Sequence, residues 1–146
     1  MQYEKYDVEG MAIHTEQGTP HYYGGIVRML FITAALVLLV ASSVGATLPL
    51  SGGAAIIHAM VLVVLAGVTN PSQRGIHWVN SAAAFFGAGI FGMSAIAHYR
   101  TTRALSDPSF FFVEALAILF LISLYYATKT IRGIYLRSVF PADPTA

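Results

Sequence analysis

Four long apolar stretches, separated by short polar ones, dominate the hydrophobic pattern of this chain. They cover about residues 26–48, 52–68, 76–99 and 109–130. An α-helix rises about 1.5 Å per residue, so it needs roughly 20 residues to cross a hydrocarbon core of about 30 Å. The pattern therefore predicts four membrane-spanning helices, of which 52–68 is the shortest and stands at the lower limit for spanning.

The connections between these stretches carry residues that end helices and turn the chain. Proline occurs with Gly, Ser or Asn in residues 47–53 and 69–75. Asp107 and Pro108 match the N-cap and the first helical position of the last stretch. Because the connections are short, neighbouring helices are expected to run antiparallel. We expect an all-α, integral membrane four-helix bundle with antiparallel up-down connectivity.

The segments outside the bundle of residues 26–130 differ in charge. Residues 1–25 form a polar, acidic tail without the apolar core of a cleavable signal peptide, and residues 131–146 form a basic juxtamembrane tail. If the first tail is cytoplasmic, two basic residues, Arg100 and Arg103, fall outside, whereas six fall inside: Lys5, Arg28, Arg74, Lys129, Arg132 and Arg137. The excess of Lys and Arg inside predicts that both termini are cytoplasmic, and we expect the plasma (inner) membrane as the location.

Composition supports a membrane location and narrows the classes of function. The chain is 56% hydrophobic and 10% charged, whereas a soluble domain is roughly 25% charged. It has no cysteine, which excludes disulfides, thiolate metal sites and cysteine nucleophiles. Its net charge of +1 gives no case for nucleic acid, and the cluster of Lys129, Arg132 and Arg137 suits anionic lipid headgroups better. The expected partners are the lipid bilayer and either a second copy or a larger membrane complex.

Small residues predict how the helices pack. In residues 76–99 one helix face carries His77, Ser81, Ala84, Ala88, Phe91, Ala95 and His98. Beside it, Ala84, Ala88 and Gly92 form a ridge of small residues, which allows close approach of helices in lipid. Shorter rows, Ala41 with Gly45 and Ala55 with Ala59, lie on the first two stretches. The ridge serves either packing within one bundle or a homodimer interface.

One carboxylate, Glu114, interrupts the apolar run of residues 110–120. A last helix that began after it, over residues 115–128, would measure about 21 Å, which is too short to span, so Glu114 is expected inside the membrane. His58 falls at the same depth, about 8–9 Å below the outer boundary. Further polar residues fall near that depth on the other helices, namely Ser42, Ser43 and Ser94, with His98 one turn further out.

We therefore predict a buried polar pair of His58 and Glu114. The pair either locks the bundle or handles protons or cations, and a third interpretation places Glu114 in a water-filled crevice that opens outward. His77, beside Trp78 at the inner boundary, is expected to be an interfacial residue.

Enzymatic motifs are missing from the sequence, including glycine-rich phosphate loops, H-E-x-x-H and G-x-S-x-G. A haem would need two histidines at matched depth, and His58 and His98 differ by about one turn. Together with Glu114 they are suitable zinc ligands, but their spacing is not diagnostic. We therefore predict no enzymatic activity, no cofactor and no metal.

Two functions remain. The first is a non-enzymatic membrane component, accessory or self-associating, in which His58 and Glu114 join helices. The alternative is a small oligomeric transporter or channel that handles protons or cations through Glu114.

Overall fold

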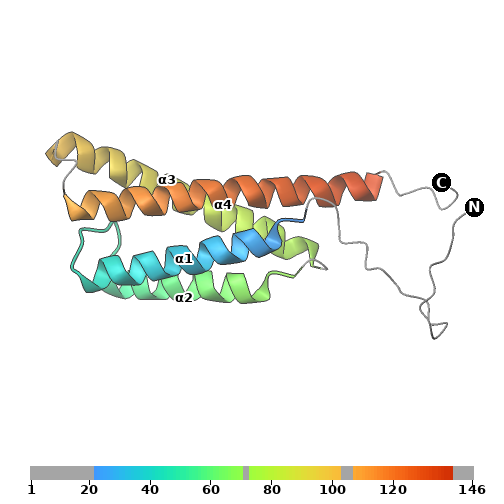
Figure 1. The fold of residues 1–146 in the computed structure, drawn as a ribbon, viewed down its shortest axis with the longest axis horizontal. Helices are drawn as coiled ribbons and strands as arrows, with labels where there is room; N and C mark the ends of the chain where they lie inside the picture. Colours follow the sequence, from blue (N-terminus) through green and yellow to red (C-terminus); the bar gives the residue numbers. More distant parts are fainter. Residues whose placement is uncertain (1–21, 71–72, 103–106, 140–146) are drawn as a thin grey trace, which may run out of the picture.

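The computed structural model describes residues 22–70, 73–102 and 107–139, and this part of the chain folds into four α-helices (Figure 1). They are α1 (Gly24–Ser43), α2 (Gly52–Val68), α3 (Arg74–Thr102) and α4 (Pro108–Val139). No strand occurs in the described ranges, so the predicted all-α, four-helix fold is confirmed. Helices α1, α3 and α4 are long and apolar enough to cross a membrane, whereas α2 is a shorter apolar helix of 17 residues. The predicted N-terminal tail to residue 21 and the last seven residues lie outside the described part.

The first helix ends five residues earlier than the sequence predicted, because Gly45 terminates it. Gly45 has a φ of +72°, in the left-handed region that favours glycine. Its N–H donates to the Ser42 carbonyl at 3.3 Å, and the Ala46 N–H donates to the Ala41 carbonyl at 2.9 Å. These two bonds form a Schellman motif, which satisfies carbonyls at the end of the helix. Gly45 therefore ends α1 and does not extend a row of small residues along it.

The N-termini of α2 and α4 are capped by side chains. The Ser51 hydroxyl accepts a hydrogen bond from the Ala54 N–H at 3.3 Å, and α2 has the predicted bounds. Asp107 Oδ1 accepts from the Ser109 N–H at 2.9 Å, and Pro108 is the first residue of α4. At its other end α4 continues to Val139 instead of residue 130, so that the predicted basic tail begins as helix. Helix α3 also extends beyond the predicted 76–99 at both ends.

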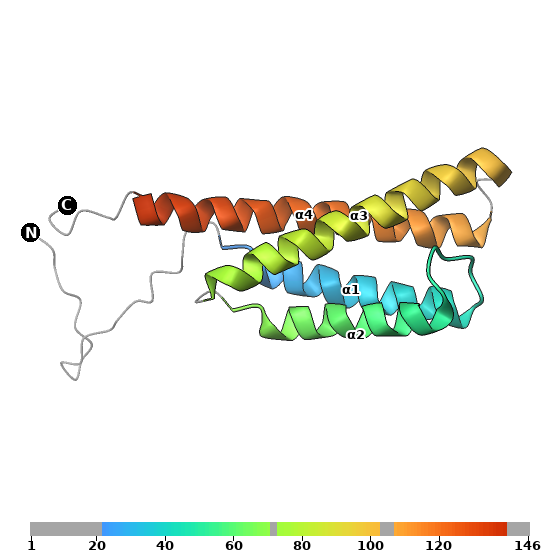
Figure 2. The ribbon, with the colours of Figure 1, turned by 180° about the vertical axis from the view of Figure 1, so that it is seen from behind.

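Helix α1 lies between α2 and α4, and packs against both (Figures 1 and 2). Helix α3 crosses the bundle obliquely and packs most extensively against α4, whereas α2 and α3 barely touch. Backbone N–H groups at both ends of α1 donate to side chains of α4. The Tyr23 N–H donates to Thr130 Oγ1 at 3.2 Å, and the Thr47 N–H donates to Ser109 Oγ at 3.1 Å.

Each helix contributes an apolar stripe to the core, with small residues where helices approach one another closely. The buried side chains of α2 are Ala55, Ala59, Leu62 and Ala66, and those of α1 include Val27, Phe31, Ala34, Ala35 and Leu38. At the centre Phe120 of α4 stacks on Phe91 of α3, with ring centroids 5.7 Å apart and planes 3° from parallel. The alanines among these large side chains allow neighbouring helices to approach closely, as is common where helices associate in lipid.

The outer faces of the helices carry many large hydrophobic side chains. Large hydrophobic side chains point outward on all four helices, among them Met29, Leu36, Ile57, Met60, Val64, Phe85, Phe86, Met93, Phe111 and Leu121. A water-soluble domain rarely exposes apolar patches on this scale. Helices that are hydrophobic all round are typical of large cores or of membrane spans.

Candidate functional site

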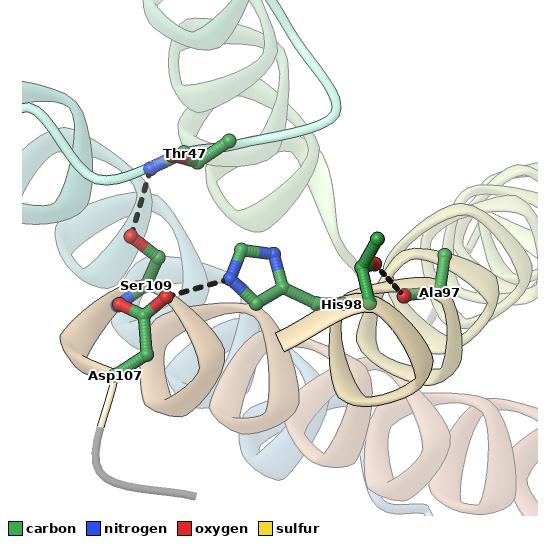
Figure 3. A network of polar contacts seen from close by, with 6 residues as sticks. Thr47, Ala97, His98, Asp107 and Ser109 are labelled. Atoms are coloured by element: carbon green, nitrogen blue, oxygen red, sulfur yellow. Dashed lines mark hydrogen bonds and ion pairs between the residues drawn. The ribbon is translucent and has the colours of Figure 1, made fainter. Parts of the chain in front are cut away.

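The first polar group lies where α3 meets α4, and we call Thr47, His98, Asp107 and Ser109 the junction cluster (Figure 3). His98 Nε2 lies 2.8 Å from Asp107 Oδ2, and the other carboxylate oxygen accepts the Ser109 N–H. The Ser109 hydroxyl in turn accepts the Thr47 N–H from the connection between α1 and α2. The cluster therefore joins three segments of the chain through the Asp107 carboxylate and the Ser109 hydroxyl.

The surroundings of Asp107 favour its charged carboxylate over the protonated acid. The hydrogen bond from His98 and then the bond from the Ser109 N–H hold the pKa of Asp107 below its usual value. The side chains of His98 and Asp107 are 17% and 28% exposed, respectively, so water reaches both. The junction cluster therefore has the chemistry of a partly solvated clamp between helices.

The predicted pair of His58 and Glu114 is not formed, although both residues lie near the start of their helices. His58 is exposed, and its Nδ1 lies 2.8 Å from the Ala54 carbonyl of its own helix. Glu114 is half-buried and makes no hydrogen bond to the described part of the chain. The pairing fails because α1 packs between α2 and α4. Residue counting gives depth along a bundle, but it gives neither the order of the helices nor their rotation.

His58 instead lines an apolar cleft between α2 and α3, with a volume of about 180 Å³. Its other lining residues are hydrophobic or glycine, including Leu62, Phe86 and Phe91. The other polar residues predicted near the depth of His58 do not hydrogen-bond to it. Ser42 and Ser94 are half-buried, and His98 belongs to the junction cluster.

The second polar group is buried at the other end of the bundle and was not predicted; we call Thr69, His77 and Asn80 the buried polar layer. Asn80 Nδ2 donates to Thr69 Oγ1 at 2.8 Å, and the Thr69 hydroxyl donates to the Leu65 carbonyl at 2.6 Å. Because that proton is committed to Leu65, the amide must present its nitrogen to Thr69. The bond connects α3 to the end of α2, where the two helices otherwise barely touch.

His77, which was predicted to be an interfacial residue, has its side chain buried inside the bundle, where it is 2% exposed. The ring makes a hydrogen bond with the backbone of Asn70, and the edge of Tyr22 packs against it at 5.7 Å between centroids. His77 Nε2 and Asn80 Oδ1 are buried without a hydrogen-bond partner among the described residues. The signal was present in the sequence, since His77 begins the face of α3 that also carries the buried Ala84, Phe91 and Ala95.

The predicted ridge of small residues on α3 divides between two environments. Ala84 is fully buried in the core, and Ala88 is partly buried against it. Gly92 is half-buried, and a Cβ at that position would meet no atom within 4 Å. The close approach occurs instead at Gly87, where a Cβ would lie 2.5 Å from the Phe120 ring. Sequence spacing thus identified the helix but missed the glycine on which its packing against α4 depends.

No group of three or more His, Asp or Glu residues within reach of one metal ion occurs in the described part of the chain. His58, His98 and Glu114 belong to separate surroundings, as described above. Comparison with models of known protein families gives no match, and searches of curated proteins and of solved structures give none either.

Proposed function

We propose that this chain is a non-enzymatic integral membrane protein, an accessory or self-associating component whose polar side chains hold its helices together. Its immediate partner is the lipid bilayer, with a second copy or a larger membrane complex beyond it. The three long apolar helices and the outward hydrophobic side chains support insertion. Helix α2 measures about 26 Å, which a locally thinned bilayer accommodates at modest cost.

We place the helices antiparallel, with both termini in the cytoplasm and the chain in the plasma (inner) membrane. The hydrogen bond from Tyr23 to Thr130 puts the start of α1 beside the later half of α4. The bond from Thr47 to Ser109 puts the connection after α1 beside the start of α4. The first of these two ends carries Arg28, Arg74, Lys129 and Arg132, which supports the cytoplasmic assignment.

The observation that carries a structural function is the use of polar groups inside the spans. Ser123 and Thr130 are buried and donate to carbonyls one turn earlier in α4, and Asn80 and Thr69 bond to each other. The cleft between α2 and α3 is lined by apolar groups apart from His58. The bonds between Asn80 and Thr69 and between Tyr23 and Thr130 join separate segments of the bundle, which supports a structural function.

The alternative, a transporter or channel that handles protons or cations, depends on Glu114, the one carboxylate inside the described spans. Its support is that Glu114 makes no hydrogen bond to the described residues, so its carboxylate is not committed to a structural contact.

Reconstitution into liposomes separates the two functions. The purified chain and its Glu114→Gln variant are placed in vesicles under an imposed potential, and a pH-sensitive dye inside the vesicles reports proton entry. We expect both proteins to match protein-free vesicles. We also expect the variant to melt no lower than the wild type, because no hydrogen bond to the described chain is lost. A proton or cation flux that Glu114→Gln abolishes in a folded protein would overturn the structural assignment.

A further inference from the structure

Most cations of the described residues lie at one end of the bundle, whereas the carboxylates lie at the other. Both described carboxylates, Asp107 and Glu114, lie in the first turns of α4 or just before it. Four basic side chains lie at the opposite end, near the starts of α1 and α3 and the later half of α4: Arg28, Arg74, Lys129 and Arg132. The described part of the chain holds one ion pair, His98 with Asp107, so these four cations have no carboxylate partner there.

Aromatic rings fix the position of one of these cations. Lys129 Nζ lies 4.6 Å from the centroid of the Tyr23 ring and 5.7 Å from that of Tyr125. Such cation–π contacts orient an ammonium group without neutralising it. Tyr23 is itself anchored, because its N–H is bonded to Thr130 on α4. Lys129 is therefore a positioned positive charge that keeps the capacity to bind an anion.

A hollow of about 280 Å³ opens beside this lysine, lined by Tyr125, Thr128, Lys129 and Arg132. Lys129 and Arg132 are three residues apart on α4, so they share a face. The Thr128 hydroxyl donates to the carbonyls of its own helix, which leaves the two cations to provide recognition. A lysine and an arginine around one hollow suit a phosphate, since arginine binds phosphate oxygens in pairs and lysine acts as a point charge.

The depth of the hollow indicates the source of that phosphate. A span of about 20 residues that begins at Pro108 ends near residue 127, so Lys129 and Arg132 emerge at the level of the headgroups. Trp78, which is 56% exposed, lies at a neighbouring hollow on the same end, lined also by Arg74, Ile131, Ile134 and Tyr135. Exposed Trp and Tyr at this level are typical of the boundary between membrane and water.

We propose that Lys129 and Arg132 form a binding site for the phosphate of an anionic phospholipid headgroup, with Tyr23 and Tyr125 holding the lysine in place. The site rests on the membrane insertion proposed above. The site gives the protein a preference for anionic phospholipids over other lipids of the same leaflet. The general excess of positive charge at this end does not specify such a site.

Native mass spectrometry tests this site. The protein is reconstituted in nanodiscs that contain phosphatidylcholine and phosphatidylglycerol in equal amounts, released in mild detergent, and its retained lipids are counted. Wild type is compared with the double variant Lys129→Gln/Arg132→Gln and with Arg100→Gln, which removes an exposed cation at the opposite end of α3. The thermal melt of each protein in detergent shows that it is folded.

Wild type and Arg100→Gln are expected to retain phosphatidylglycerol in excess over phosphatidylcholine. The double variant is expected to lose most of that excess, because each basic group at the surface contributes about fivefold to binding of an anionic lipid. Raised salt is expected to lower the excess for wild type. The retained excess reports the site independently of stability.

A double variant that is folded and keeps the wild-type excess would overturn the site while leaving membrane insertion intact. A wild type that shows no excess of phosphatidylglycerol would overturn the site in the same way. A chain that does not enter nanodiscs at all would instead contradict the proposed membrane function.

Discussion

At the scale of single residues, the polar side chains of this protein connect different segments of the bundle. Asp107 caps α4, binds His98 of α3, and through Ser109 reaches Thr47 after α1. Asn80 and Thr69 provide the corresponding connection between α2 and α3. A polar group in such a place favours one arrangement of the two segments, because its hydrogen bond forms only within a narrow range of distance and angle.

Asp107→Asn tests the junction cluster through its dependence on pH. The folded state lowers the pKa of Asp107, so its contribution to stability is complete above the unfolded value of about 3.9 and is lost as pH falls through the folded value. We expect the variant to melt below wild type at pH 7, and the difference to shrink below about pH 4. Thermal melts in detergent between pH 3 and 7 measure this. A difference that is constant across this range would show that the charge of Asp107 contributes nothing.

At the scale of helices, the ends and close approaches depend on a few glycines and caps. The caps of α2 and α4 were predictable, because Ser51, Asp107 and Pro108 have local roles that sequence reveals. The end of α1 was not predicted, since the apolar pattern continues through Val44 to Leu48 and hides the turn at Gly45. The continuation of α4 beyond residue 130 was not predicted either. Its basic residues suggested a tail, but they belong to the helix.

Gly45→Ala is expected to destabilise the protein, because alanine at a φ of +72° is strained. The cost of a left-handed conformation for a residue with a Cβ is about 1 kcal/mol. Gly67→Ala is the matched control, since Gly67 lies within α2 and an added Cβ there meets nothing within 4 Å. Unfolding in detergent should show a loss for Gly45→Ala and none for Gly67→Ala. Equal stability of the two variants would argue against the Schellman end of α1.

Gly87→Ala is expected to disturb the packing of α3 on α4. The new Cβ would lie 2.5 Å from Phe120 Cδ1, and Phe120 is buried and stacked on Phe91, so it has little room to move. Overpacking of this kind costs about 1–3 kcal/mol. Gly89→Ala serves as control, because its Cβ would be in open space. A Gly87→Ala variant as stable as Gly89→Ala would show that the two helices are not in close contact at this point.

At the scale of the whole molecule, the sequence was sufficient for the fold class and the number of helices but insufficient for their order. Lengths, turn residues and apolar runs are local properties, and they predicted four helices near the observed positions. The arrangement with α1 between α2 and α4 depends on contacts between distant segments. For this reason residue counting assigned His58 and Glu114 to the same depth, although the two side chains do not pair. The same limit hid the bond between Asn80 and Thr69, which joins two helices through residues with no recognisable motif.

The most direct test of the account is the accessibility of single cysteines, for which a chain without native cysteine is well suited. Single cysteines are placed at Gly25, Ser51, Gln73, Arg100 and Tyr135, all exposed, and an impermeant maleimide is added to intact cells and to opened membranes. With both termini in the cytoplasm, positions 51 and 100 are expected to react from outside intact cells, whereas 25, 73 and 135 are expected to react only after the membranes are opened. Labelling of 25 and 51 from the same side, or loss of the protein from the membrane fraction, would contradict the account.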